Sequence, residues 1–187
     1  MRAAWAWVAA ALLPGCAALP SPEDFAAVRP LDRSATTAFR LEGRLAIRQG
    51  ENRHHVRVSW QHEADADVML IASPLGQGIA ELTRDRRGAH LLTSDRRSFE
   101  APDLDTLSEE VFGFRMPLAG LPRWLLADLP PTAVDRFGRP LAARAGDWLI
   151  AYLDYESESA GALPLLMEFR RGDLEIRLKV DSWDLSP

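Results

Sequence analysis

Histidine and acidic side chains are the first candidates for chemistry in this 187-residue chain, and their spacing forms no recognised site. His54 and His55 are adjacent in an alternating stretch, so they point to opposite faces of a strand, and no paired ligand spacing recurs. Glu109 and Glu110 are also adjacent, so on a helix they diverge, whereas paired catalytic carboxylates converge. We therefore expect no metal site and no carboxylate pair.

Nucleophile and nucleotide motifs are absent as well. The chain contains no G-x-S-x-G sequence, and its only lysine, Lys179, does not follow a glycine, which excludes a Walker A loop. The formal net charge of −5 argues against a nucleic-acid partner. The sequence therefore predicts a protein that is not an enzyme and has no cofactor.

Cys16 is the only cysteine and the one residue with a predicted covalent modification. Residues 1–16 begin with the cation Arg2, continue as an uncharged run and end in the tetrapeptide LPGC. The run is shorter than the ~20 apolar residues that cross a bilayer, and its pattern is typical of a signal peptide. LPGC is similar to a bacterial lipobox, which predicts a signal peptide at 1–15 and an acylated Cys16. The alternative is a free thiol in an uncleaved segment.

The segment after the cysteine predicts an anchor and a tether. By resemblance to Gram-negative lipoproteins, Ala17 in place of Asp implies sorting to the outer membrane, with a lipid anchor and the domain on the periplasmic face. Residues 16–38 are predicted to be the lipidated N-terminus and a tether, because 17–38 mix Pro, Ala, Ser and charge without a period. As a flexible coil, ~23 residues reach about 25–30 Å, which would let the domain turn any face to the membrane.

Residues 39–187 are expected to form a single domain, because they alternate between apolar and polar side chains and are linked by short connections. Both features are typical of antiparallel strands with one buried face. The stretch 67–73 is apolar on both faces, which favours a central position. The expected strands are 39–48, 54–60, 67–73, 78–84, 89–94, 97–101, 133–138, 147–155, 163–171 and 173–185.

Two short helices are predicted between the strands. Asp103 can cap a helix whose apolar residues recur at helical spacing, and residues 116–131 contain a second helix with Leu121 and Trp124 on one face. The predicted fold class is mostly β with an α lid (α+β): a curved antiparallel sheet of roughly ten strands whose concave face is covered by the helices.

The order and spacing of several motifs resemble the LolB family of outer-membrane lipoproteins. They are FRLEGRLAI (39–47), SWQ (59–61), SPLG (73–76), LSEEVFGFRMPLAGLPRWLL (107–126), DWLIAY (147–152) and LEIRLKVDSW (174–183). Ala127 and Asp128 depart from the family pattern, which has a glycine soon after the Trp-containing helix. The resemblance implies an open β half-barrel closed by helices, with an apolar cavity for acyl chains.

The resemblance also implies a function and partners. LolB proteins accept acylated lipoproteins from the periplasmic carrier LolA and insert them into the inner leaflet of the outer membrane. The expected partners are thus a LolA-type carrier, acylated client lipoproteins and outer-membrane phospholipid, and the protein is expected to be a monomer. Two other functions stay open on the residues alone: an esterase that acts on lipids in the cavity, and a passive outer-membrane interaction module.

Four tryptophans are candidate walls of the acyl-chain cavity in view of the resemblance, whereas the residues alone favour an interpretation as ordinary core. They are Trp60, Trp124, Trp148 and Trp183.

The turn SPLGQG (73–78) carries an aliphatic side chain, Leu75, among turn-forming residues. In a meander it shares a sheet edge with Arg96 and Arg97, an apolar tip beside cations that suit phospholipid headgroups. The resemblance includes this turn, which favours Leu75 as a membrane-inserting residue and the two arginines as headgroup contacts. The alternative is that Leu75 tucks under its turn and the arginines are solvated.

Overall fold

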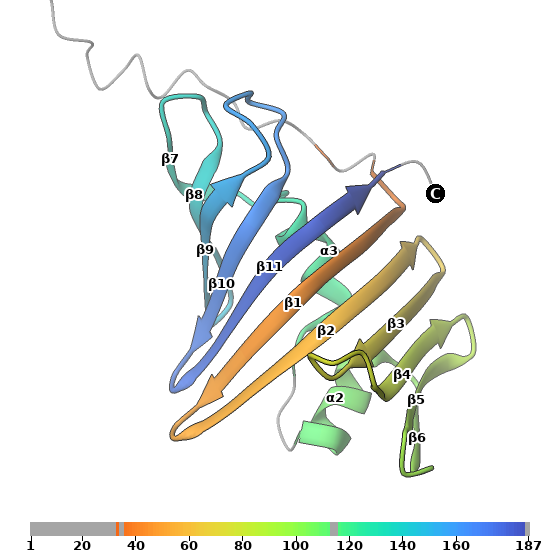
Figure 1. The fold of residues 1–187 in the computed structure, drawn as a ribbon. Helices are drawn as coiled ribbons and strands as arrows, with labels where there is room; N and C mark the ends of the chain where they lie inside the picture. Colours follow the sequence, from red (N-terminus) through yellow and green to blue (C-terminus); the bar gives the residue numbers. More distant parts are fainter. Residues whose placement is uncertain (1–32, 34–35, 113–115, 186–187) are drawn as a thin grey trace, which may run out of the picture.

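The computed structural model describes residues 33, 36–112 and 116–185, which form one curved antiparallel sheet with helices on its concave face (Figure 1). The first six strands run in sequence. They are β1 (Phe39–Gln49), β2 (Asn52–Glu63), β3 (Ala66–Ala72), β4 (Gly78–Asp85), β5 (Gly88–Thr93) and β6 (Ser98–Ala101).

The chain then forms the helices and returns through a second meander. These elements are α2 (Leu104–Phe112), the 3-10 helix η1 (Leu118–Gly120), α3 (Leu121–Leu125), β7 (Pro131–Val134), β8 (Pro140–Ala145), β9 (Trp148–Tyr155), β10 (Pro164–Arg171) and β11 (Leu174–Asp184). The spatial order is β6-β5-β4-β3-β2-β1-β11-β10-β9-β8-β7, so β1 and β11 join the two meanders. The sheet is open, with β6 and β7 at its edges, which confirms the predicted half-barrel.

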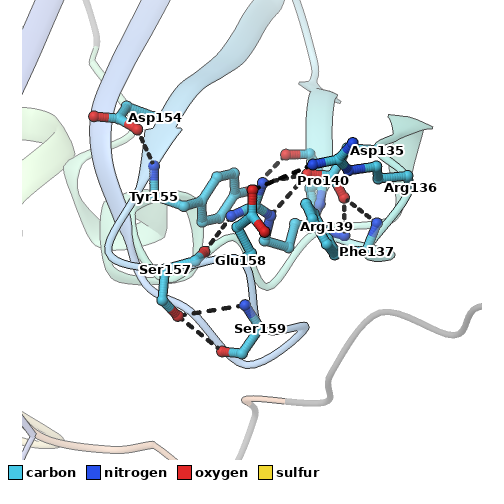
Figure 2. Close-up of polar contacts among 10 residues, drawn as sticks. All are labelled: Asp135, Arg136, Phe137, Arg139, Pro140, Asp154, Tyr155, Ser157, Glu158 and Ser159. Carbon is cyan, nitrogen blue, oxygen red and sulfur yellow. Dashed lines mark hydrogen bonds and ion pairs between the residues drawn. The ribbon is translucent and has the colours of Figure 1, made fainter.

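The second meander has one strand more than the sequence predicted. The expected strand 133–138 is a short strand, β7, followed by a turn in which the carboxylate of Asp135 accepts the backbone N–H of Phe137 and Arg139 at 2.9 and 3.0 Å. Figure 2 shows this turn and the ion pair between Arg136 and Glu158 that links it to the β9–β10 connection. The next strand, β8 (PLAARA), has little apolar alternation, which is why the sequence did not reveal it.

Strand β3 is not buried on both faces, although both are apolar. Val68 and Leu70 on the convex face are 41% and 47% exposed, whereas Asp67, Met69 and Ile71 face the concave side. Strand β3 lies inside the sheet, between β2 and β4, as predicted from the sequence. Its convex face stays exposed because the helices cover only the concave face.

Both predicted helices form, and each has an identifiable end. The Asp103 side chain accepts the backbone N–H of Thr106 at 2.7 Å, which caps α2 as predicted. Helix α3 is shorter than the predicted stretch and is followed by Ala127 at φ 54°. This left-handed conformation usually belongs to glycine, which has no Cβ.

A residue from the predicted tether is attached to the domain. The Arg33 guanidinium donates to the carbonyl of Leu126 after α3, and to those of Gly161 (2.9 Å) and Ala162 (2.6 Å) before β10. We call this set of contacts the Arg33 latch. The predicted signal peptide and Cys16 lie outside the described residues. In the described part of the chain, no helix is long and apolar enough to cross a membrane.

Candidate functional site

An apolar cavity of about 360 Å³ lies between the concave face of the sheet and the helices. Its size falls in the ~300–1,000 Å³ range of small-molecule sites. One wall consists of side chains from β1 to β5 and from β9 to β11, such as Leu45, Val58 and Phe169. The other consists of side chains from α2 to α3, such as Leu107, Met116 and Leu121. The cavity thus lies where the sequence predicted it, under the lid.

Three polar residues border the cavity, and each directs its polar atoms to another partner. Ser108 donates to the carbonyl of Asp105 (2.6 Å) and accepts the backbone N–H of Met116 (2.8 Å). Thr93 binds Asp95 and Arg97 in the β5–β6 turn, and Asp67 belongs to the network described below. A ligand in this cavity therefore meets hydrocarbon and aromatic surface, which suits acyl chains.

Three of the four predicted tryptophans border the cavity. Trp124 from α3 and Trp148 from β9 lie with ring centroids 5.7 Å apart at one side of it, and Trp60 from β2 contributes to another wall. The three rings are also almost fully buried in the core, so the same side chains both line the cavity and pack the core.

Trp183 does not border the cavity, so its assignment to the cavity wall was wrong. It pairs across strands with Leu41 near the end of β11, packs edge-on against Phe39 at 5.5 Å and donates its indole N–H to the carbonyl of Pro164 at 2.8 Å. There it packs against the main core as a partly buried side chain. Sequence alternation could place Trp183 on a face but not at a height along the strand.

A buried charged network that the sequence analysis missed supports the wall at Trp60. The Asp67 carboxylate accepts the Trp60 indole N–H at 2.9 Å, contacts His62 Nδ1 at 2.7 Å and forms an ion pair with Arg84. Burial acts to raise the pKa of Asp67, but the hydrogen bonds from His62, Arg84 and Trp60 outweigh it and hold the pKa below its usual value. The alternation of β3, which places Asp67 on the same face as Met69, could have revealed this inward carboxylate.

Leu75 is 92% exposed at the tip of the β3–β4 loop, so it does not tuck under its turn. Ser73 and Gly76 close a β-turn, with the Gly76 N–H donating to the Ser73 carbonyl at 2.9 Å and Pro74 in the second position. Gly76 has φ 87°, which a glycine tolerates without strain. The turn therefore holds the aliphatic side chain out into solvent.

The β5–β6 turn lies beside the β3–β4 loop, as the alternation of a meander predicts. Ala80 pairs with Thr93, and the Ser94 N–H donates to the carbonyl of Ile79 at 2.8 Å. Arg96 and Arg97 in this turn are both exposed, and Arg97 forms an ion pair with Asp95 at 2.8 Å. Part of the positive charge proposed for headgroup contact is thus already neutralised.

Catalytic chemistry finds little support around the cavity. Within residues 33, 36–112 and 116–185, no three His, Cys, Asp or Glu side chains gather as metal ligands. The hydroxyl of Ser108, which borders the cavity, is engaged in hydrogen bonds with the backbone of Asp105 and of Met116.

Comparison with known proteins identifies relatives over almost the whole chain. The family model "Outer membrane lipoprotein LolB" matches residues 37–183. An outer-membrane lipoprotein LolB from Azoarcus sp. strain BH72 is 39% identical over 98% of this chain and 95% of the relative, and one from Nitrosomonas europaea is 35% identical over 83% and 78%. In fold, the chain is similar to the crystal structure of a LolA superfamily protein from Nitrosomonas europaea. That match has a TM-score of 0.50 and 9% identity, and covers 81% of this chain and 87% of the other.

Proposed function

This chain belongs to the LolB family, and we propose that it is an outer-membrane lipoprotein that accepts acylated lipoproteins from a LolA-type periplasmic carrier and inserts them into the inner leaflet of the outer membrane. The observation that carries the proposal is the apolar cavity under the lid. A cavity whose polar neighbours all turn away selects hydrocarbon chains and offers no anchor for a polar ligand.

Hydrophobic transfer can drive both steps without nucleotide hydrolysis. Each buried methylene contributes about 0.8 kcal/mol, so small differences in how completely the carrier, this cavity and the bilayer bury the same chains set the direction of transfer. The client moves towards the environment that binds its acyl chains most tightly.

The membrane end of the pathway involves the lipid anchor and the β3–β4 loop. We propose that Cys16 carries the anchoring lipid and that Leu75 enters the bilayer surface during delivery. Burial of one leucine yields only ~1.5–3 kcal/mol, which is too little for an anchor but enough to disturb lipid packing locally. Leu75 therefore guides release and does not hold the protein on the membrane.

Transfer from the carrier tests the central step. A purified LolA-type carrier loaded with an acylated client is mixed with this protein, and client bound to each is measured after separation. We expect stoichiometric capture by the wild-type protein and none of it in Ile71→Glu, which places a carboxylate at the cavity wall.

Leu70→Glu is the matched control, because Leu70 is the neighbouring β3 residue and faces outward at 47% exposed. It should capture client as the wild type does. A wild-type protein that leaves the client on the carrier, or an Ile71→Glu variant that captures normally, would contradict the proposal.

A further inference from the structure

A second hollow of about 360 Å³ lies on the convex face of the sheet, across β11, β1 and β2. Five basic side chains surround it: Arg44, His55, Arg57, Arg177 and Lys179. Pro74, from the loop that carries Leu75, completes its rim. We call this feature the basic hollow.

The strand register explains both the charge and the space. Arg44 on β1 pairs directly with Arg57 on β2 and with Lys179 on β11, so three cations lie in one row across the sheet. In the next row, Ala46 lies between His55 and Arg177. Because a methyl group is short, Ala46 leaves a depression among the long basic side chains.

Only part of this positive charge is neutralised inside the protein. Arg44 pairs with Asp181 at 2.6 Å, and Arg177 pairs with Glu168 at 2.8 Å. Arg57 and Lys179 are exposed, and neither has an ion-pair partner among the residues that the structure describes. Like charges directly opposite each other on paired strands are destabilising, so an anion bound between them would be stabilised by the arrangement.

We infer that the basic hollow binds the phosphate of a phospholipid headgroup while the β3–β4 loop contacts the bilayer. The inference deepens the proposed function and rests on it, because it gives the membrane-facing surface a headgroup site. Pro74 lines the hollow and the next residue is Leu75, so the hollow and the exposed aliphatic tip are continuous. An apolar tip beside unneutralised cations is the combination that binds at the surface of anionic bilayers.

The His55 ring reports directly on occupation of the hollow. The mature lipidated protein is held in uncharged detergent micelles, and its four histidine ring signals are assigned with single variants such as His55→Gln. Phosphatidylglycerol is then added, with diacylglycerol, which lacks the phosphate, as the matched lipid. We expect a saturable shift of the His55 signal with phosphatidylglycerol, and no shift with diacylglycerol.

Two variants and a control test the residues. Arg57→Gln/Lys179→Gln removes two positive charges from the hollow and Ala46→Glu fills it with a carboxylate; each should abolish the shift. Arg87→Gln/Arg144→Gln removes the same charge from exposed sites elsewhere and should retain it. Thermal unfolding of each variant checks that the fold is kept. Loss of the repulsion of Arg57 and Lys179 with Arg44 in the same row should make the first variant no less stable.

Three outcomes would overturn the inference. The first is no His55 shift in the wild type, and the second is an equal shift in the hollow variants. The third is an equal shift with inorganic phosphate at matched concentration, which would identify a free anion as the ligand. Capture of client from the carrier takes place at the cavity on the other face and is measured separately. A failure of capture with an intact His55 shift would thus refute the proposed function alone.

Discussion

Trp124 from the lid and Trp148 from the sheet lie with their ring centroids 5.7 Å apart and their planes inclined at 54°, at the cavity wall. The Tyr152 hydroxyl donates to the carbonyl of Trp124 at 2.8 Å, which ties the same helix to β9. The lid is therefore attached to the sheet at its aromatic end, so these two rings are placed to sense a ligand beneath the lid.

The emission of Trp124 and Trp148 should change when an acyl chain enters the cavity, and the affinity should depend steeply on chain length. A chain shorter by four methylenes should bind about 200-fold more weakly, since each contributes ~0.8 kcal/mol. Titration of fatty acids of two lengths into the protein measures this. Trp183→Phe should leave the response unchanged, and an affinity independent of length would indicate a filled core.

Leu75→Glu should leave folding and client capture intact but slow delivery into liposomes. The side chain is 92% exposed, so its replacement removes no packing, whereas a carboxylate at the tip opposes entry into the bilayer. Transfer of a bound lipoprotein to liposomes is followed over time. Leu153→Glu, at a half-exposed leucine on β9, is the control. Equal delivery rates for the Leu75 variant and the wild type would remove Leu75 from the mechanism.

Asp67→Asn should destabilise the domain by roughly 3–5 kcal/mol, because it leaves the Arg84 charge at a largely buried site without its partner. The pKa of Asp67 is lowered in the folded state, so its contribution is present above the unfolded-state value of ~3.9 and is lost as the pH falls through the folded-state value. The free energy of unfolding, measured with urea between pH 2.5 and 7, should therefore fall less steeply at acid pH in the variant than in the wild type.

Asp65→Asn provides the comparison for the Asp67 variant. Asp65 pairs with Arg86 at 2.6 Å, but both side chains are well exposed and screened by solvent, so its loss should change the free energy of unfolding far less than the loss of Asp67. Similar losses of stability for the two variants would contradict the assignment of Asp67 as a buried structural charge.

Ala127→Gly should raise the free energy of unfolding by about 1 kcal/mol, because Ala127 adopts φ 54°, which costs an L-residue with a Cβ roughly that amount. Thermal unfolding measures the change. Ala143→Gly, at a buried alanine in the middle of β8, should instead lower the free energy of unfolding, since glycine weakens a strand. A loss of stability at position 127 would show that the methyl group matters more for packing than for backbone strain.

Periodicity and turn chemistry were enough to predict most of the architecture. Alternation in β1 and β2, the cap at Asp103 and the short connections together specify an antiparallel sheet with helices on one face. The missed strand, β8, shows little alternation because three of its six residues are alanine, so its pairing with β9 depends on tertiary context.

The candidate site was predicted less completely, for two physical reasons. Sequence alternation gives the face of a residue but not its position along the strand, which is why Trp183 was placed in the cavity although it packs against the main core outside the cavity. Partners across strands are also set by register, so neither the pairing of Asp67 with Arg84 nor the row of Arg44, Arg57 and Lys179 could be derived from the sequence.

The Arg33 latch shortens the segment that would connect the domain to a lipid anchor at Cys16. Between Cys16 and Arg33 there are 17 residue steps, which reach at most about 55–60 Å. The latch lies at the end of the sheet where β10 begins, and the Leu75 loop lies towards the other end. Strand β1 gives the scale of this separation: from Phe39 to Ala46, which lines the basic hollow together with Pro74, it rises ~23 Å. With Cys16 and Leu75 both at the bilayer, the segment between Cys16 and Arg33 would have to run back along the domain. Held at two points, the protein would rock about a fixed axis and present the same face to the lipid in every delivery, in place of the free turning that an unlatched tether would permit.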